Sequence, residues 1–215
     1  MTVGRARDIL GHPAIRSSEI DPVSKGAGLT AYHFDYHAAR GHEDRRIAQQ
    51  FHRGETPAER DWEAIWIEPT PRRMADAVLA EFADGFGWVQ DDLRALTTPL
   101  PVIAEGWGLR PELVAPITST LDRMVVLVPT DEFRRSQAAH LPRAGQVNAK
   151  VSDPDLAQRN RLERDRLLAE DAANAARRLG IRVLEVDGSR DAEAVADELA
   201  DHFGPFLPRP LARIG

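Results

Sequence analysis

Residues Met124–Val128 form a continuous apolar run, MVVLV, that stops at Pro129-Thr130-Asp131. A run without alternating polar residues is typical of a strand that is buried on both faces. Shorter β-rich runs at 29–34, 101–105 and 181–186 alternate with segments of helical pattern. This alternation predicts an α/β protein whose mainly parallel sheet is covered by helices. Ligands of such sheets bind at the carboxyl ends of the strands.

Helix boundaries are marked by local signals. A capping residue followed by proline occurs at Thr56-Pro57, Thr70-Pro71 and Asp153-Pro154, and each pair predicts the first turn of a helix. Gly180 is expected to end the helix that begins at Asp153. We expect Gly85 and Gly87 to interrupt or end the helix that starts at Thr70. The chain, 1–215, is predicted to be one domain in which 36–100 form a mostly helical insertion.

Composition excludes several classes of function. The net charge of −6 leaves no global basic field for nucleic acid or anionic lipid. There are no cysteines, so disulfides and thiolate chemistry are absent. No apolar run approaches the roughly 20 residues that cross a bilayer. We expect a cytoplasmic protein with a small-molecule or nucleotide ligand, no nucleic-acid or membrane partner, and an oligomeric state that the sequence leaves open.

Several short motifs occur in an order and spacing that point to one family. They are Tyr32-His33-Phe34-Asp35, DDLRAL at 91–96, Ala104-Glu105-Gly106, Leu127-Val128-Pro129-Thr130 and NRLERDRLL at 160–168. Over roughly residues 29–190 the chain resembles the P-loop nucleoside and nucleotide kinases, including the shikimate and adenylate kinase types. More narrowly, its second half resembles a group of uncharacterised bacterial kinase-like proteins.

The resemblance implies a three-layer P-loop kinase-like fold and ATP- and Mg²⁺-dependent phosphotransfer to a small molecule or nucleoside. Asp35 would be the substrate-binding or general-base carboxylate, with the helix N-cap as its alternative reading. Glu105 would lie beside the phosphates and Mg²⁺, unless it is part of a solvated turn. Trp107, close to Glu105, could stack on a substrate ring or pack in the core. In the family order, the strands at 101–105 and 123–128 flank a first strand formed by residues before 11, without which the sheet has a gap or closes up.

The phosphate-binding loop of this family is damaged here. The pattern G-x-x-x-x-G-K-[ST] supplies backbone N–H groups, a lysine and a Mg²⁺-binding hydroxyl. Gly11 and Ser18 match it, but Arg16 and Ser17 replace the second glycine and the lysine. If the loop is a remnant rather than a coincidence, Gly11, Arg16, Ser17 and Ser18 contact ATP, and Ser18 shares Mg²⁺ with Glu105. Arg16 could partly replace the missing charge.

Basic residues gather on the helix predicted after Asp153. Arg159 and Arg166 share one face, and Arg161 and Arg164 share a neighbouring one. The resemblance implies that Arg159 binds the nucleotide and that Arg164 neutralises the transferring phosphate. The alternative is a solvated face whose arginines pair with Glu163, Asp165 and Glu170. Arg134 and Arg135 admit the same two interpretations.

Other candidate residues have structural explanations. His33 and His37 could ligate zinc only on a helix, and His33 falls in a predicted strand, so we expect no metal site among His33, His37 and His42. Trp62 and Trp66 share one helix face and could line a substrate pocket, but core or helix packing is the expectation. Asp91 and Asp92 are interpreted as surface or capping residues.

Three readings of the whole chain follow. The first is an ATP-dependent phosphotransferase, impaired in this chain. The second is a non-catalytic protein that binds a nucleotide or a partner, which the missing lysine favours. The third is a misplaced start or an early frameshift, because residues 1–28 match the family poorly. No motif in 36–100 identifies the phosphoryl acceptor.

Overall fold

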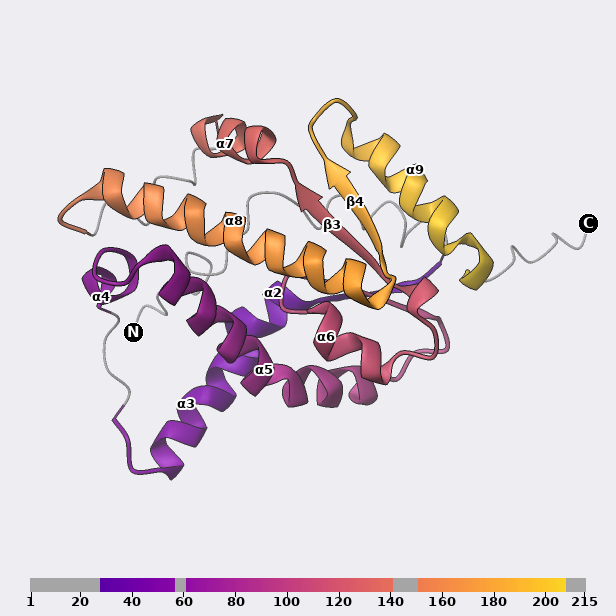
Figure 1. The fold of residues 1–215 in the computed structure, drawn as a ribbon. Helices are drawn as coiled ribbons and strands as arrows, with labels where there is room; N and C mark the ends of the chain where they lie inside the picture. The colour runs from indigo at the N-terminus through magenta and orange to yellow at the C-terminus, as the bar shows by residue number, and fades with distance from the viewer. Residues whose placement is uncertain (1–27, 57–60, 141–150, 208–215) are drawn as a thin grey trace, which may run out of the picture.

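The computed structural model describes residues 28–56, 61–140 and 151–207 (Figure 1). Along the chain lie β1 (Thr30–His33), α2 (Phe34–His37), a π-helical turn η2 (Ala38–His42), α3 (Glu43–His52), α4 (Trp62–Trp66), α5 (Pro71–Ala95), β2 (Val102–Glu105), α6 (Pro111–Val114), β3 (Val125–Pro129), α7 (Asp131–His140), α8 (Pro154–Leu179), β4 (Arg182–Val186) and α9 (Ala192–Phe203). Short 3₁₀ turns cover Ala115–Ile117, Leu121–Arg123 and Gly204–Phe206. Within these ranges no helix has the length and apolar character to span a bilayer.

The described strands form two parallel pairs. β1 pairs with β2, with Thr30 opposite Val102 and His33 opposite Glu105. β3 pairs with β4, with Val125 opposite Arg182. The predicted strands and their parallel pairing are confirmed, so the fold is broadly α/β. Within the described ranges, however, the pairs are separate two-stranded sheets rather than one sheet.

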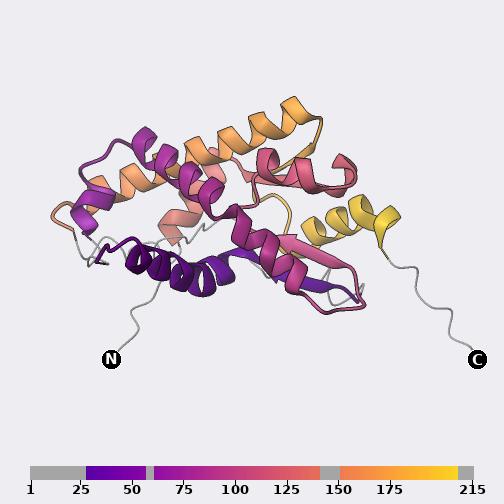
Figure 2. The same ribbon diagram turned by 90° about the horizontal axis from the view of Figure 1, so that it is seen from below.

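Helix α8 joins the two halves of the molecule. It packs against β3 and β4, and it lies beside α5 (Figures 1 and 2). Its buried face is rich in alanine, including Ala157, Ala172, Ala173 and Ala176, and small side chains allow neighbouring elements to approach closely. The β3/β4 pair runs between α8 and α9 in Figure 1.

Among the described residues, three apolar clusters make up the core. Leu184 of β4 packs with Val195, Ala196 and Leu199 of α9, and Ile103 of β2 joins this cluster. The second cluster contains Tyr32, Phe34, Phe82, Phe86 and Val89, which hold β1 and α2 on α5. The third places Trp66 with Met74 and Ala157 and is flanked by Trp62. The packing role expected for Trp62 and Trp66 is therefore confirmed.

Most predicted helix ends are confirmed by cap geometry. Thr70 accepts a hydrogen bond from Arg73 N, and Asp153 accepts one from Leu156 N. Gly180 ends α8 in the left-handed conformation, with φ of 74°. At the third site, Pro57 lies outside the described residues, and the helix begins instead at Trp62, where Asp61 caps Glu63 N and Ala64 N.

The prediction that Gly85 and Gly87 end the long helix is wrong. Helix α5 continues through both glycines to Ala95. Each glycine in a helix interior costs only about 1 kcal/mol relative to alanine. Burial of Phe82, Phe86 and Val89 on one face of α5 outweighs that cost.

Candidate functional site

Asp35 and Glu105 lie at the carboxyl ends of neighbouring strands. Glu105 is the last residue of β2 and stands opposite His33 of β1, and Asp35 follows His33 by two residues. His33 Nδ1 lies 2.6 Å from Glu105 Oε1. Two carboxylates and an imidazole therefore meet where parallel sheets bind ligands.

Asp35 is not the helix N-cap. The helix begins at Phe34, and the cap residue, His33, makes no side-chain capping bond. The Asp35 carboxylate instead accepts a hydrogen bond from the backbone N–H of Trp107. The Oδ1 atom of Asp35 is buried and has no hydrogen-bond partner among the described residues.

Burial, and then the nearby charge of Glu105, raise the pKa of Asp35 to about 7, against the opposing effects of His33 and the Trp107 N–H. Desolvation disfavours the ionised form of a carboxyl group, and a neighbouring carboxylate adds to that effect. Asp35 therefore exchanges its proton near neutral pH, which is the property of a general base or acid.

The loop Gly106-Trp107-Gly108 is held against Phe34. A Cβ atom on Gly106 would lie 2.5 Å from Phe34 Cβ, and one on Gly108 would lie 2.2 Å from Phe34 Cζ. Gly106 also has φ of 137°, which side chains rarely adopt. The two glycines thus let Trp107 reach Asp35. This fit was not predicted from the sequence, although the G-W-G spacing after a strand is a visible signal.

We expect Gly108→Ala to destabilise the protein by about 1–3 kcal/mol, because the added methyl group overpacks Phe34. Gly87→Ala is the matched control, because nothing lies within 4 Å of a Cβ there and α5 is helical. That substitution should stabilise the protein by about 0.5–1 kcal/mol. Urea unfolding of both variants measures the difference, and an equal effect of the two changes would contradict the close packing.

Arg164 and Trp107 are engaged with each other. The Arg164 guanidinium lies over the rings of Trp66, at 4.7 Å, and Trp107, at 5.7 Å. It also donates to Asp165 Oδ1 from Nε at 2.9 Å and from Nη2 at 2.7 Å. Arg164 and Asp165 are both buried, so the solvated-face interpretation is wrong for this pair and also for Arg161. Trp107 packs edge-on to Phe82, at 5.0 Å, and so belongs to the core.

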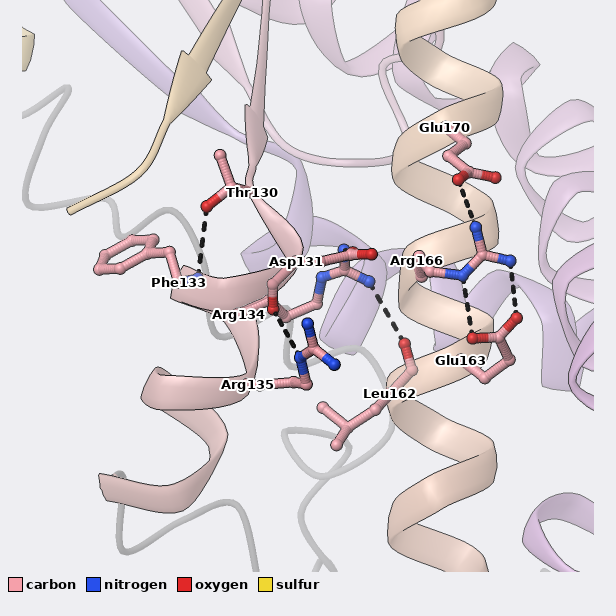
Figure 3. A network of polar contacts seen from close by, with 9 residues as sticks. All are labelled: Thr130, Asp131, Phe133, Arg134, Arg135, Leu162, Glu163, Arg166 and Glu170. Carbon is pink, nitrogen blue, oxygen red and sulfur yellow. Dashed lines mark hydrogen bonds and ion pairs between the residues drawn. The ribbon is translucent and has the colours of Figure 1, made fainter.

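A cleft of about 200 Å³ between α7 and α8 holds the remaining arginines; it is lined by Asp131, Arg134, Arg135, Arg159, Leu162, Glu163 and Arg166 and is called the basic cleft below. In Figure 3, Arg134 and Arg135 approach α8 from α7. Arg159 and Arg166 share this face, as their spacing predicts. Thr130 belongs to the same region, but its hydroxyl caps α7 at Phe133 N.

Charges in the basic cleft are only partly neutralised. Arg166 donates to Glu163 at 2.9 and 2.6 Å and also pairs with Glu170 (Figure 3). Arg134 pairs with Asp131 and donates to Leu162 O. The described part of the chain offers Arg159 no hydrogen-bonding or ionic partner, and Arg135 contacts only the backbone oxygen of Asp131, at 3.3 Å. Two guanidinium groups therefore remain available to an anion.

Asp92 is the centre of a second polar group that sequence reasoning missed; we call Asp92, Tyr32, His37, His42 and Arg45 the Asp92 cluster. Asp92 Oδ2 accepts from Tyr32 Oη at 3.3 Å, lies 2.8 Å from His42 Nε2 and lies 3.5 Å from His37 Nδ1. Arg45 Nη2 donates to Oδ1 at 2.9 Å. The surface interpretation is correct for Asp91, whose side chain is 63% exposed, and wrong for Asp92, at 14%.

Two predicted features remain, the phosphate loop and a metal site. Gly11, Arg16, Ser17 and Ser18 lie outside the described residues. Among the described residues, no group of three or more His, Cys, Asp or Glu side chains is arranged to hold a metal ion by itself.

No protein-family model matches this chain, and neither a curated protein nor a solved structure proved similar to it.

Proposed function

We propose that this chain is a P-loop kinase-like protein that binds a nucleotide and a small-molecule or nucleoside acceptor at the carboxyl ends of its strands. In this proposal ATP-dependent phosphotransfer is impaired by Arg16 and Ser17 in the phosphate loop. The observation that carries the proposal is the meeting of Asp35 and Glu105 where β1 and β2 end, with Asp35 Oδ1 buried and unpartnered among the described residues.

Asp35 is the residue proposed to act on the acceptor. A free carboxylate oxygen beside a sheet edge is suited to accept the proton of a substrate hydroxyl. The Gly106-Trp107-Gly108 loop packs closely on Phe34, and the Trp107 N–H fixes the direction of the carboxylate. Phosphotransfer depends mainly on such positioning, because little covalent chemistry is done by the protein.

Arg159, rather than Arg164, is proposed to neutralise the transferring phosphate. Arg164 is already paired with Asp165 and lies over the rings of two tryptophans. Arg159 faces the basic cleft together with Arg135, and both retain free donors. Guanidinium groups bind phosphate oxygens through paired N–H donors, so the cleft favours a phosphate-bearing ligand.

The carboxylates also fit the magnesium ion that the family resemblance implies. Mg²⁺ is usually held by one or two carboxylates together with substrate phosphates, and Asp35 and Glu105 supply two adjacent carboxylates. Glu105, with Ser18 from the loop, would hold the ion, which would neutralise charge on the phosphoryl oxygens. One oxygen of Glu105 is engaged by His33, and that contact orients the carboxylate.

The finer fold is part of the proposal. A three-layer kinase-like sheet would have one more strand between β2 and β3, from residues before 11, which lie outside the described residues. Two observations support this arrangement. The two parallel pairs share no strand, and Ile103 of β2 packs in the same cluster as Val125 and Leu127 of β3.

Calorimetric titration with ATP–Mg²⁺ tests the proposed function. The unmodified chain should bind weakly, because its loop lacks a permissive glycine and the lysine. The double variant Arg16→Gly/Ser17→Lys should bind more tightly, on the scale of about 10²–10³-fold, which is the effect of one preorganised donor. In that background, Arg159→Ala should weaken binding by about tenfold or more. Arg178→Ala, an exposed arginine on the same helix, is the matched control.

Each outcome separates two readings. No gain in the double variant would mean that residues 1–28 form no phosphate loop. Tight binding by the unmodified chain would show that Arg16 replaces the lysine. Tight binding without formation of ADP in the presence of candidate acceptors would favour a non-catalytic nucleotide-binding protein, the second reading, which the substitutions at Arg16 and Ser17 already support.

A further inference from the structure

The helix that follows β1 changes its winding next to Asp35. Residues Phe34–His37 are α-helical, Ala38–His42 form the π-helical turn η2, and α3 resumes the α-helix at Glu43. Such turns are rare and occur often at functional sites, where they redirect side chains. Here the turn separates Asp35 from the whole of α3.

The π-helical turn explains how two histidines reach one carboxylate. His37 and His42 are five residues apart, and in an α-helix that spacing leaves them about 140° apart around the axis. Hydrogen bonds from i to i+5 bring them to the same side instead. Their ring centroids are 6.5 Å apart, and both rings contact Asp92 Oδ2. Gly41 within the turn also weakens the competing α-helical form.

Helix α3 lies at the surface of the molecule. None of its residues is buried, and Phe51 near its end is 64% exposed. Arg45 links it to α5 through Asp92 Oδ1 at 2.9 Å and the Trp88 carbonyl at 3.4 Å, and the charge of Glu81 on α5 also acts on Arg46. The other side of Asp92 is held by Tyr32. Burial and the neighbouring Asp92 raise the pKa of the Tyr32 phenol, so it remains a donor.

We propose that Asp92 is a positioning residue: its contacts with His37, His42 and Arg45 hold the π-helical turn and fix the direction in which α3 leaves Asp35. The contacts that define this role do not depend on any ligand. That α3 thereby forms one wall of the acceptor site rests on the proposed function.

Amide hydrogen exchange on the full chain tests the anchoring. In Asp92→Asn, exchange over residues 38–52 should rise about 10- to 100-fold, because hydrogen bonds to a charged group are lost. Exchange in β3, β4 and α9 should not change. Asp91→Asn is the matched control, because it removes the same charge from an exposed side chain one residue away from Asp92. Its exchange should equal that of the unmodified chain.

A second measurement separates positioning from a general loss of stability. Couplings across backbone hydrogen bonds, measured by NMR, report whether amides in the turn bond to the fifth or the fourth preceding carbonyl. Asp92→Asn should shift them to the fourth. His42→Gln, which keeps a donor for Asp92 Oδ2, should preserve the π-helical turn, whereas His42→Leu should not.

The proposal is overturned if the π-helical pattern persists in Asp92→Asn, or if exchange rises equally throughout the protein. Should Asp92→Asn fail to fold, the His42→Gln and His42→Leu pair decides, and identical exchange in these two variants overturns it. No nucleotide or acceptor enters these measurements, so their failure is distinct from a failed ATP titration.

Discussion

Replacing Asp35 by asparagine is expected to make the protein more stable at pH 8, by about 2–4 kcal/mol. The folded-state pKa of Asp35 is raised from the ordinary 3.8 to about 7, so folding disfavours its ionised form. The destabilising effect is full above pH 7, declines as the pH falls from 7 toward 4, and is absent below 4. Asparagine removes it at every pH. Urea unfolding at pH 8 and pH 5 measures the gain and its decline.

Asp91→Asn is again the control, because its exposed carboxylate has only a 3.5 Å contact with Arg94. It should change stability by less than about 0.5 kcal/mol at either pH. A gain for Asp35→Asn that is the same at pH 5 and pH 8 would show that shape, and not charge, is responsible. Stabilisation by removal of a site residue is the expected sign of a functional group held in an unfavourable environment.

Replacing Arg164 by alanine should have the opposite and largest effect, a loss of about 3–5 kcal/mol. The carboxylate of Asp165 is fully buried, and Arg164 is its ionic partner. Without the guanidinium, the charge of Asp165 is left without compensation, and the stacking on Trp66 and Trp107 is lost as well. The shift in the urea midpoint measures this loss.

Arg166→Ala provides the comparison on the same helix. Arg166 also forms ion pairs, but Glu163 and Glu170 are about half exposed, and such pairs contribute about 0–1 kcal/mol. The double variant Arg164→Met/Asp165→Leu should recover most of the stability lost in Arg164→Ala, since apolar groups of similar volume often replace a buried pair. Equal losses for Arg164→Ala and Arg166→Ala would contradict the burial described above.

Local signals were the reliable part of the sequence. Thr70-Pro71, Asp153-Pro154 and Gly180 each mark a helix end through a hydrogen bond or a backbone angle within a few residues, so neighbouring residues suffice to predict them. The apolar run before Pro129 predicted a strand, and β3 forms there in parallel with β4, although only Val128 and Pro129 of it are buried. Gly85 and Gly87 misled because their effect is decided by Phe82 and Phe86, which bury their rings against other segments.

Roles that depend on distant partners could not be predicted. Asp92 looked like a surface residue because its partner Tyr32 lies 60 residues away in the sequence. Asp35 could be read as a helix cap because the Trp107 N–H that it accepts from lies in a distant loop. The burial of the Arg164–Asp165 pair could not be predicted, because a charged pair in sequence gives no sign of the two tryptophans that cover it.

Helix α8 also dictates an order of events during synthesis. Trp66 of α4 and Met74 of α5 pack with Ala157 of α8, so this part of their apolar surface stays uncovered until the later helix has been made. Chains usually fold from the N-terminal side as they emerge, and exposed apolar surface in the meantime promotes aggregation. The apolar surface of Trp66 and Met74 is therefore covered only after Pro154–Leu179 has emerged and docked.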